Sequence, residues 1–279
     1  MRGARVTDAA EFRGRAGPLL EEDELRHTVP LGVLSTLERD PSRYAERHLW
    51  LVENAGRVVA CAMMTPPFHL LVAGQDQAAL EELVATVRGD GVPVPGVNGV
   101  VPEAEQFAAC WARATGATTR RSMSLRMYAT TSVTPVPAAV GEMRTAGESD
   151  RSLLAEWAHA FADETGLQGG PGEIARSIVA RVGADPGIVL WDVGGTVVTM
   201  AGASVSSPGI ARVGPVYTPP KHRRRGYATS LVAAWTEELL GRGIRRCALF
   251  TDLANPTSNS IYQAVGYRPV ADAAEFDFT

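Results

Sequence analysis

The sequence has little of what would mark a disulfide-bonded, metal-binding or membrane-embedded protein. It contains only three cysteines, Cys61, Cys110 and Cys247, and no CxxC pair, so neither a disulfide framework nor a zinc site is expected. The longest weakly polar stretch, residues 58–74, is broken by two prolines and a histidine, which excludes a membrane-spanning helix. Residues 1–15 mix basic and acidic side chains without an apolar block. We therefore expect no signal peptide and a cytoplasmic protein that needs no metal.

An excess of charge of one sign is missing as well. The chain has 27 Lys and Arg residues against 31 Asp and Glu residues, which gives a formal net charge of −4. Nucleic acids and anionic membranes select broadly basic surfaces, so we expect neither as a partner. What the chain does have is 45% hydrophobic residues over 279 positions. That length allows one large domain or two domains of about 140 residues.

A linker near the middle of the chain favours two domains. Residues 130–140 (TTSVTPVPAAV) carry two prolines, four Ser or Thr residues and no charge, which is typical of a linker. On either side, Trp50–Ala62 aligns without gaps with Val189–Ala201, and both stretches have the pattern strand, Gly turn, strand. Any β-hairpin shares this pattern, so internal duplication stays a hypothesis. We predict domains over residues 1–132 and 138–279.

The periodicity of the second half predicts alternating helices and strands. Helices are predicted over 149–165, 173–182, 225–240 and 256–265, and strands over 188–193, 196–205, 210–217, 246–251, 267–270 and 274–278. In the first half we predict a helix over 19–37 with a break near Pro30, a hairpin over 48–72, helices over 75–88 and 103–115, and a strand over 122–130. The fold class is therefore α/β, with a mixed, mainly antiparallel sheet flanked by helices in each domain.

Segment 213–229 (VGPVYTPPKHRRRGYAT) joins a predicted strand to a predicted helix through a basic loop. A helix N-terminus presents unpaired N–H groups and the positive end of the helix dipole, so it attracts anions. A glycine at this point, Gly226, lets those amides approach a phosphate closely. Three arginines at a helix start are unfavourable for the helix alone. We therefore interpret the loop as a phosphate-binding site, although most such runs are solvated basic patches.

The spacing Arg223-x-x-Gly226-x-Ala228 is neither a Walker A loop nor a dinucleotide fingerprint. It resembles the pyrophosphate-binding motif (R/Q)xxGx(G/A) of the GCN5-related N-acetyltransferases (GNAT). Residues 255–267 (NPTSNSIYQAVGY) resemble the family's second signature, a helix that begins at an Asn and carries a Tyr seven residues later. The resemblance covers residues 140–279. It implies a GNAT fold and acetyl-coenzyme A (acetyl-CoA) as cosubstrate.

Site residues are carried over from the resemblance position by position. The cofactor-binding residues that it implies are Val216, Tyr217, Thr218, Arg223, Arg224, Arg225, Gly226, Tyr227, Ala228, Thr229, Asn255 and Ser258. The family has a bulge near Pro215, and a proline inside a sheet strand favours one because it removes a ladder donor. Tyr262 would be the general acid, since a phenol with a pKa near 10 can protonate the departing sulfur. From the residues alone, Asn255 could instead be only a helix cap and Tyr262 only a core aromatic residue.

These observations predict an acetyl-CoA-dependent N-acetyltransferase. The acetyl group would pass directly, in a ternary complex, to a primary amine of a small molecule or peptide, and Asp163, Glu164 and Glu173 are candidates for the base. The first half lacks the arginine loop, since TPPFHLLV at 65–72 has apolar residues in its place, so we expect a degenerate GNAT-like half without cofactor. The alternatives are a non-catalytic CoA or acyl-CoA sensor or scaffold, and a tandem acetyltransferase like mycothiol synthase. Monomer and homodimer both remain open.

Overall fold

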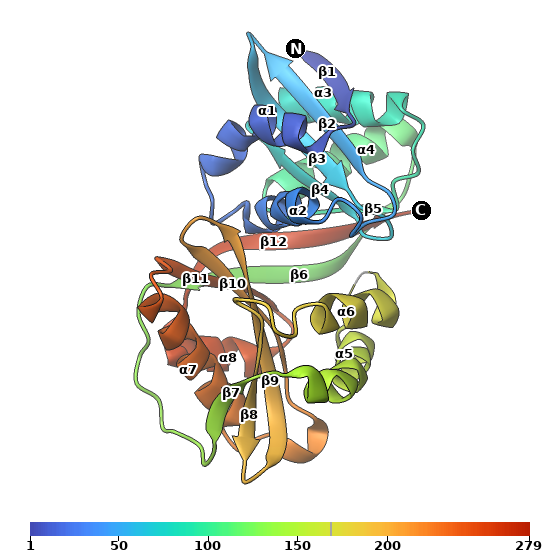
Figure 1. The fold of residues 1–279 in the computed structure, drawn as a ribbon. Helices are drawn as coiled ribbons and strands as arrows, with labels where there is room; N and C mark the ends of the chain where they lie inside the picture. Colours follow the sequence, from blue (N-terminus) through green and yellow to red (C-terminus); the bar gives the residue numbers. More distant parts are fainter. Residues whose placement is uncertain (168) are drawn as a thin grey trace. The chain divides into compact units, whose positions relative to one another are not determined.

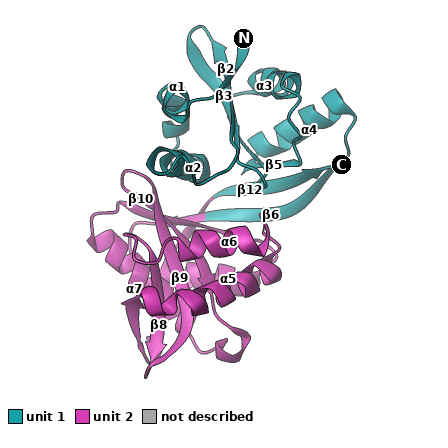
Figure 2. Cartoon of the chain, turned by 45° about the vertical axis from the view of Figure 1, so that its right-hand side comes forward, with its two compact units in different colours: residues 1–127, 271–279 teal, residues 128–270 magenta. Residues whose placement is uncertain are grey.

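The chain divides into two units, each built around its own part of a β-sheet. The structure is a computed structural model that describes residues 1–167 and 169–279. Unit 1 consists of Met1–Met127 together with Ala271–Thr279, and unit 2 consists of Tyr128–Val270 (Figure 2). The domain boundaries proposed above, at 132 and 138, stay a prediction.

Unit 1 has seven strands in the order β1-β2-β3-β4-β5-β12-β6 (Figure 1). The strands are β1 (Arg2–Val6), β2 (His48–Asn54), β3 (Arg57–Met64), β4 (Leu70–Gly74), β5 (Gly96–Val100), β6 (Thr119–Thr130) and β12 (Arg268–Phe278). The helices are α1 (Ala9–Glu21), α2 (Thr28–Arg39), α3 (Gln77–Gly89) and α4 (Glu103–Thr115). Strands β4 and β5 are parallel, and the pairs β1–β2, β2–β3, β3–β4 and β5–β12 are antiparallel.

Alternation along β2 shows how unit 1 buries both faces of its sheet. Leu49 and Leu51 belong to the apolar cluster formed with α1 and α2. Trp50 and Val52 belong to the cluster formed with α3 and α4. Successive side chains of a strand point to opposite faces, so the continuously apolar stretch Leu49–Val52 must be covered by helices on both sides.

The predicted helix over 19–37 is wrong in its bounds. The structure has two helices, α1 and α2, and the break lies at residues 22–27 instead of near Pro30. Pro30 is the third residue of α2, in the first turn, where its missing N–H has no helical acceptor to lose. Strands β1 and β5 were not predicted, because each is only five residues long.

Unit 2 has five strands in the order β11-β10-β9-β8-β7. The strands are β7 (Glu142–Thr145), β8 (Ile188–Val193), β9 (Thr196–Ser207), β10 (Ile210–Tyr217) and β11 (Arg246–Asp252). The helices are α5 (Arg151–Thr165), α6 (Gly170–Val179), α7 (Tyr227–Gly241) and α8 (Pro256–Val265), with short 3-10 turns η1 (Glu148–Asp150) and η2 (Pro220–His222). Strands β8, β9 and β10 form an antiparallel meander. The mixed sheet flanked by helices is confirmed for the fold.

Two apolar clusters cover the two faces of the unit 2 sheet. Helices α5 and α6 pack on one face, with Leu190 and Met200. Helices α7 and α8 pack on the other, with Val189 and Ala201. A side chain of this sheet therefore points either toward α5 and α6 or toward α7 and α8.

The last strand, β12, lies between β5 and β6 in the strand order. Residues Ala273–Asp277 of β12 pair antiparallel with Gly96–Val100 of β5 in unit 1. Phe276 and Phe278 pack against the unit 1 core, and the rings of Phe278 and Trp111 are stacked with their centroids 5.5 Å apart. The end of the chain is thus an integral strand of unit 1.

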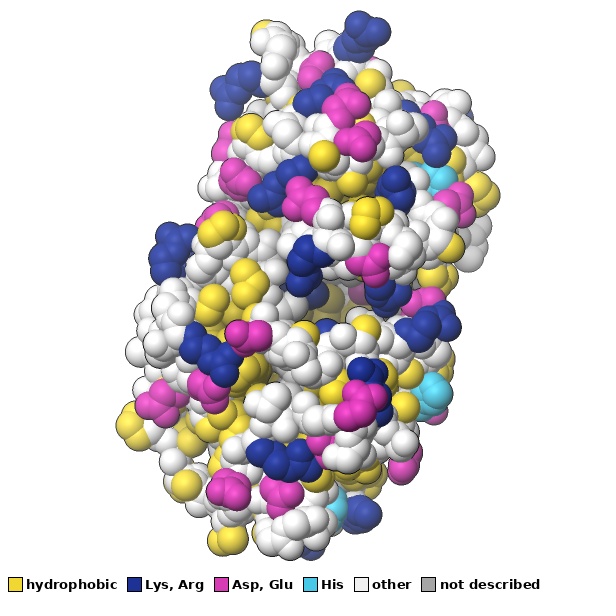
Figure 3. Space-filling model, in the orientation of Figure 1, with side chains coloured by type: hydrophobic (Ala, Val, Ile, Leu, Met, Phe, Trp, Pro, Cys, Tyr) yellow, Lys and Arg dark blue, Asp and Glu magenta, His cyan; other side chains and the backbone are white. Residues whose placement is uncertain are grey.

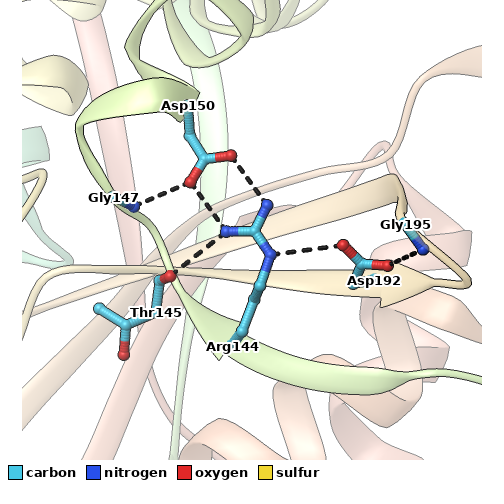
Figure 4. A network of polar contacts seen from close by, with 6 residues as sticks. All are labelled: Arg144, Thr145, Gly147, Asp150, Asp192 and Gly195. Atoms are coloured by element: carbon cyan, nitrogen blue, oxygen red, sulfur yellow. Dashed lines mark hydrogen bonds and ion pairs between the residues drawn. The ribbon is translucent and has the colours of Figure 1, made fainter.

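A partly buried charge network fixes the start of α5 in unit 2 (Figure 4). The guanidinium of Arg144 on β7 donates to both carboxylate oxygens of Asp150, at 2.8 Å each, and to Asp192 on β8 at 3.4 Å. The Gly147 N–H donates to the same Asp150 carboxylate. The hydrogen bonds from Arg144 are the main reason why the pKa of Asp150 is lowered. The network joins β7 and β8 to the start of α5.

Candidate active site

Strands β10 and β11 form a fork. They run parallel and pair from Ile210↔Arg246 to Arg212↔Ala248. Beyond these residues both strands continue, to Tyr217 and Asp252, without further pairing to each other among the described residues. We call the facing edges 213–217 and 249–252 the β10–β11 fork. Backbone groups on these edges are available to a ligand, because no neighbouring strand satisfies them.

A bulge interrupts β10 on one edge of the fork. The pairing with β9 passes from Val213↔Ala203 to Val216↔Ala201, so Gly214 and Pro215 stand opposite the single residue Gly202. Gly214 has φ +140°, a conformation that L side chains rarely adopt. The bulge expected near Pro215 is therefore present, and it re-aims the backbone beside the fork.

Of the expected cofactor-binding residues Val216, Tyr217 and Thr218, Val216 is the best placed to bind through its backbone. The carbonyl of Tyr217 accepts a hydrogen bond of 2.8 Å from the Thr199 hydroxyl on β9, so Tyr217 directs its backbone groups toward β9. Because successive residues of a strand direct these groups to opposite sides, Val216 directs its N–H and C=O toward the fork. The carbonyl of Thr218 is already bonded to Arg223 Nε at 2.8 Å.

The N-terminus of α7 is open. Helix α7 begins at Tyr227, its N-cap Gly226 has φ +79°, and no side chain caps it. The first helical bond runs from Ser230 N–H to the Gly226 carbonyl at 3.0 Å, which leaves the N–H groups of residues 226–229 without helical acceptors. These residues include Tyr227, Ala228 and Thr229, as the motif implies. A side chain at Gly226 would force this left-handed backbone into strain.

The three arginines before α7 differ in their surroundings. The guanidinium of Arg223 forms an ion pair of 2.5 Å with Glu164 on α5 and lies 5.9 Å above the Tyr217 ring. Arg224 and Arg225 are exposed and form no hydrogen bond or ion pair within the described part of the chain. Arg224 has φ +60°. Among the described residues, Arg224 and Arg225 are therefore unpaired cations at the open helix end, whereas Arg223 is paired with α5.

His222 lies in the same loop, and its surroundings change its pKa. Partial burial and the positive charges of Lys221 and Arg225 lower its pKa. Lys221 and Arg225 contribute to a locally positive potential at this loop. An anion bound at this loop would relieve that potential.

Tyr262 lies on α8, buried to 8% exposure in the core shared with α7. Its ring meets the Tyr267 ring edge-on, with centroids 6.1 Å apart. Burial raises the pKa of Tyr262 to about 12, so the phenol is fully protonated at neutral pH. Its hydroxyl makes no hydrogen bond to the described residues. The phenol therefore carries the proton that a general acid must donate.

The start of α8 is capped as the sequence indicated. The side chain of Asn255 accepts a hydrogen bond of 3.0 Å from the Ser258 N–H. Asn259, one turn into α8, donates to the carbonyls of Asp252 and Asn255. These bonds fix the turn between β11 and α8 and explain the Asn content of this segment structurally. A further role of Asn255 and Ser258 in cofactor binding stays a prediction.

The acids considered as the base are not equivalent. Glu164 accepts from the Tyr217 hydroxyl at 3.2 Å and pairs with Arg223. Glu173 pairs with Arg176 one turn further along α6. Asp163 is exposed. Two of the three carboxylates are thus engaged by arginines, and none stands out as a base by its contacts.

The corresponding helix of unit 1 has the opposite electrostatics. Helix α3 follows β4 after only Gln75 and Asp76, and Asp76 caps it by accepting from the Ala79 N–H at 2.8 Å. A carboxylate at the N-cap satisfies the helix and repels a second anion. That the first half has no cofactor cradle stays a prediction.

One feature of the fork was missed from the sequence. Arg181, just after α6, donates through Nη2 to the carbonyls of Ala203 and Gly214, at 3.1 and 2.9 Å. A single arginine in a turn has no periodic or motif signal. Gly202 was the available hint, because a glycine inside a strand often marks a close approach of another group.

No group of three or more metal-ligating side chains occurs within residues 1–167 and 169–279. None of the helices described is long and apolar enough to cross a bilayer. On the face drawn in Figure 3, basic and acidic side chains are interspersed. This mixture follows from the nearly balanced composition.

Comparisons with known proteins point to one family. Residues 192–276 match the model of the family described as FR47-like protein. The fold is similar to an acetyltransferase of the GNAT family from Colwellia psychrerythraea, with 13% identity, 100% of both chains covered and a TM-score of 0.67. It is also similar to a GCN5-related N-acetyltransferase from Sphaerobacter thermophilus, with 17% identity, 98% of this chain and 94% of that chain covered and a TM-score of 0.63.

A third similar structure is a tandem GNAT protein from the clavulanic acid biosynthesis pathway, with 18% identity, 99% and 98% coverage and a TM-score of 0.59. No curated protein sequence matches the chain. At these identities the structures establish the fold, and the family model adds a sequence match over the segment that contains the basic loop. The resemblance to the GNAT family seen in the sequence is confirmed.

Proposed function

Because the fold is similar to GNAT acetyltransferases and the segment that matches the FR47-like model contains the fork and the basic loop, we propose that this chain is an acetyl-CoA-dependent N-acetyltransferase. The observation that carries the proposal is the open N-terminus of α7. It combines an uncapped glycine start with two exposed arginines that have no acidic partner among the described residues. An anion is the ligand that both features favour.

The cosubstrate would be held in two parts. Its diphosphate would lie against the N–H groups of residues 226–229, with Arg224 and Arg225 supplying charge. Its pantetheine arm would extend along the β10–β11 fork, where Val216 offers one N–H donor and one C=O acceptor in the manner of an added strand. Unit 1, whose corresponding helix is capped by Asp76, would bind no second cosubstrate.

The chemistry is one displacement at the thioester carbonyl. The amine nitrogen of the acceptor attacks the acetyl carbon, a C–N bond forms, and the C–S bond breaks. The departing sulfur takes the phenolic proton of Tyr262, and the amine gives up its own proton to solvent or to a base. A backbone N–H of the bulge would stabilise the oxygen that becomes negative. The acceptor would be a primary amine of a small molecule or peptide.

A titration of CoA into the purified protein tests the proposal. We expect heat of binding with the wild type, and about a fivefold to tenfold weaker affinity for Arg224→Ala at 50 mM salt. The difference should shrink at 300 mM salt, because the lost contribution is a charge near solvent. Arg242→Ala removes the same charge at the other end of α7, where Glu238 and Asp185 pair with it, and should bind CoA as the wild type does.

Absence of heat with the wild type would contradict the proposal, and equal affinity of Arg224→Ala would remove the cradle from α7. The non-catalytic alternative makes a different prediction. A sensor or scaffold would bind CoA with the same dependence on Arg224 and show no acetyl transfer to any member of a broad panel of amines. Including the cysteinyl aminoglycoside acceptor in this panel tests the mycothiol-synthase-like alternative.

A further inference from the structure

Arg181 is a buried cation whose only hydrogen-bond acceptors within the described residues are backbone carbonyls. Its Nη2 donates to Ala203 O on β9 at 3.1 Å and to Gly214 O on β10 at 2.9 Å. Its Nε is buried without any partner, and no carboxylate lies within ion-pair distance in the described ranges. The guanidinium therefore bridges the two strands at the point where β10 bulges.

The neighbouring charge makes this placement more costly. Burial is the main reason why the pKa of Arg181 is lowered to about 10, and the positive charge of Arg212 lowers it further. A neutral donor could satisfy two carbonyls without the penalty of burying a charge beside another charge. Two hydrogen bonds alone do not explain why a charged arginine is buried here.

Two glycines shape the site in different ways. Gly214 needs its freedom of backbone conformation, since its φ is +140° and no atom lies within 4 Å of where a side chain would begin. Gly202 has an ordinary conformation but no space, because a Cβ there would lie 2.2 Å from Arg181 Nη2. The guanidinium thus occupies the space beside Gly202, the one residue that faces the bulge.

From these contacts we propose that Arg181 is a positioning residue for acetyl transfer. Its guanidinium holds the Gly214 carbonyl toward the face covered by α5 and α6 and so fixes the bulge from which Val216 presents its N–H to the thioester carbonyl. This inference rests on the function proposed above. Without Arg181, the Gly214 carbonyl is free to turn toward the fork, where its oxygen would repel the oxygen that becomes negative.

The position of Arg181 separates it from the diphosphate cradle. It reaches β10 from the turn after α6 and contacts the bulge, whereas the cradle is formed by the loop that precedes α7. A change at Arg181 should therefore alter the acetyl end of the bound cosubstrate and leave the diphosphate end unchanged. Loss of a merely structural contact would instead weaken the binding of both ends.

The test uses acetyl-CoA labelled with 13C at the carbonyl carbon, bound to the full-length protein. The carbonyl 13C resonance reports hydrogen bonding at the acetyl end, and the 31P resonances of the diphosphate report the cradle in the same sample. The variants are Arg181→Met, which removes the donor, and Gly202→Ala, which displaces the guanidinium but keeps the arginine. Arg57→Met removes an exposed arginine of unit 1 that pairs with Glu22 and serves as the control.

We expect the carbonyl resonance to shift in Arg181→Met and Gly202→Ala, with unchanged 31P resonances and an affinity for CoA within twofold of the wild type. For the amine that the panel finds best, kcat should fall at least tenfold while the KM for acetyl-CoA changes less than threefold. Arg181→Lys, which keeps the charge and one donor, should recover part of kcat. Arg57→Met should match the wild type throughout.

An unchanged carbonyl resonance and kcat in Arg181→Met would overturn the inference. So would a loss of CoA affinity and a change of the 31P resonances as large as the effect on kcat, because that pattern describes a structural residue. A wild-type protein that gives no bound acetyl-CoA signal refutes the proposed function itself. That result is recognised before any variant is compared.

Discussion

At the scale of single residues, Tyr262 carries the sharpest prediction. Its phenol is buried, protonated at neutral pH and without a hydrogen-bond partner in the described chain. We expect Tyr262→Phe to lower kcat by about 100-fold or more, the usual contribution of a general acid, and to leave CoA affinity within twofold. Steady-state kinetics with calorimetry on the same preparation measure both quantities.

Tyr267→Phe is the matched control for this change. The Tyr267 hydroxyl is fully buried and bonded to Thr236 at 2.7 Å, so its removal should lower stability by about 1 kcal/mol and leave kcat unchanged. Equal kcat values for the wild type and Tyr262→Phe would remove the phenol from the mechanism. Because a pKa of about 12 lies far above neutrality, ionisation of Tyr262 should cause no fall in rate up to pH 9.

Site residues differ in how well their surroundings can be predicted from the sequence. Gly226 could be assigned because the glycine stands at a fixed distance from Arg223 in a recognisable spacing. The different surroundings of the adjacent arginines could not be predicted, since Glu164, which engages Arg223, lies 59 positions away. Arg181 had no local signal, because its partners are carbonyls of two strands that the sequence brings together only on folding.

At the scale of elements, length decided which segments could be predicted. The ten residues of α8 carry a cap, a proline at the first position and a closing glycine, so its bounds were predicted exactly as 256–265. Strand β7 has four residues, two of them charged, and gives no alternating pattern. It forms because it pairs with β8. Such a non-local contact is not reflected in the strand propensity of its own residues.

The network that anchors α5 yields an element-scale prediction. Asp150 is 7% exposed and receives two hydrogen bonds from Arg144. Arg144→Met leaves this carboxylate without its cation and should destabilise the protein by about 2–3 kcal/mol. In the double variant Arg144→Met/Asp150→Asn most of this loss should be recovered, because no buried charge remains.

Urea unfolding of the four proteins of this cycle measures the coupling. Arg57→Met is the control, since its pair with Glu22 is exposed and should contribute less than about 0.5 kcal/mol. Strictly additive effects of the two substitutions would show that Arg144 and Asp150 do not stabilise α5 as a pair.

At the scale of the whole molecule, the position of a strand in the sequence does not say to which unit it belongs. Residues 271–279 end the sequence but belong to unit 1, where they pair with β5. The sequence favours strand structure here, as predicted, but alternation alone does not say which neighbour a strand pairs with. The fold class could therefore be inferred from local patterns, whereas the partner of the last strand could not.

This placement puts a titrating acid in the core of unit 1. Glu275 on β12 is 5% exposed and accepts a hydrogen bond of 2.6 Å from Asn98 on β5. Burial, with a smaller effect of the Asp277 charge, raises the pKa of Glu275 to about 7. The folded protein therefore binds a proton at this site between about pH 4.5 and 7, where the unfolded chain has released it.

Stability must then fall as pH rises through this interval, by about 3 kcal/mol in total for a shift of this size. Buried His69 and His27 have lowered pKa values and act in the opposite direction up to about pH 6.5, so the overall curve mixes these effects. The difference between the wild type and Glu275→Gln isolates the carboxyl group. We expect the free energy of unfolding of Glu275→Gln relative to the wild type to increase steadily from pH 5 to pH 7.5.

Asp272→Asn on the same strand provides the control. Arg126 lowers the pKa of Asp272, so its stabilising charge is lost only as pH falls below the usual range of an aspartate, and this variant should leave the pH dependence between 5 and 7.5 unchanged. Urea titrations at four pH values in this interval give the comparison. A constant difference between the wild type and Glu275→Gln would mean that the carboxyl group is not buried with the unit 1 core, and hence that the end of the chain does not complete unit 1 in solution.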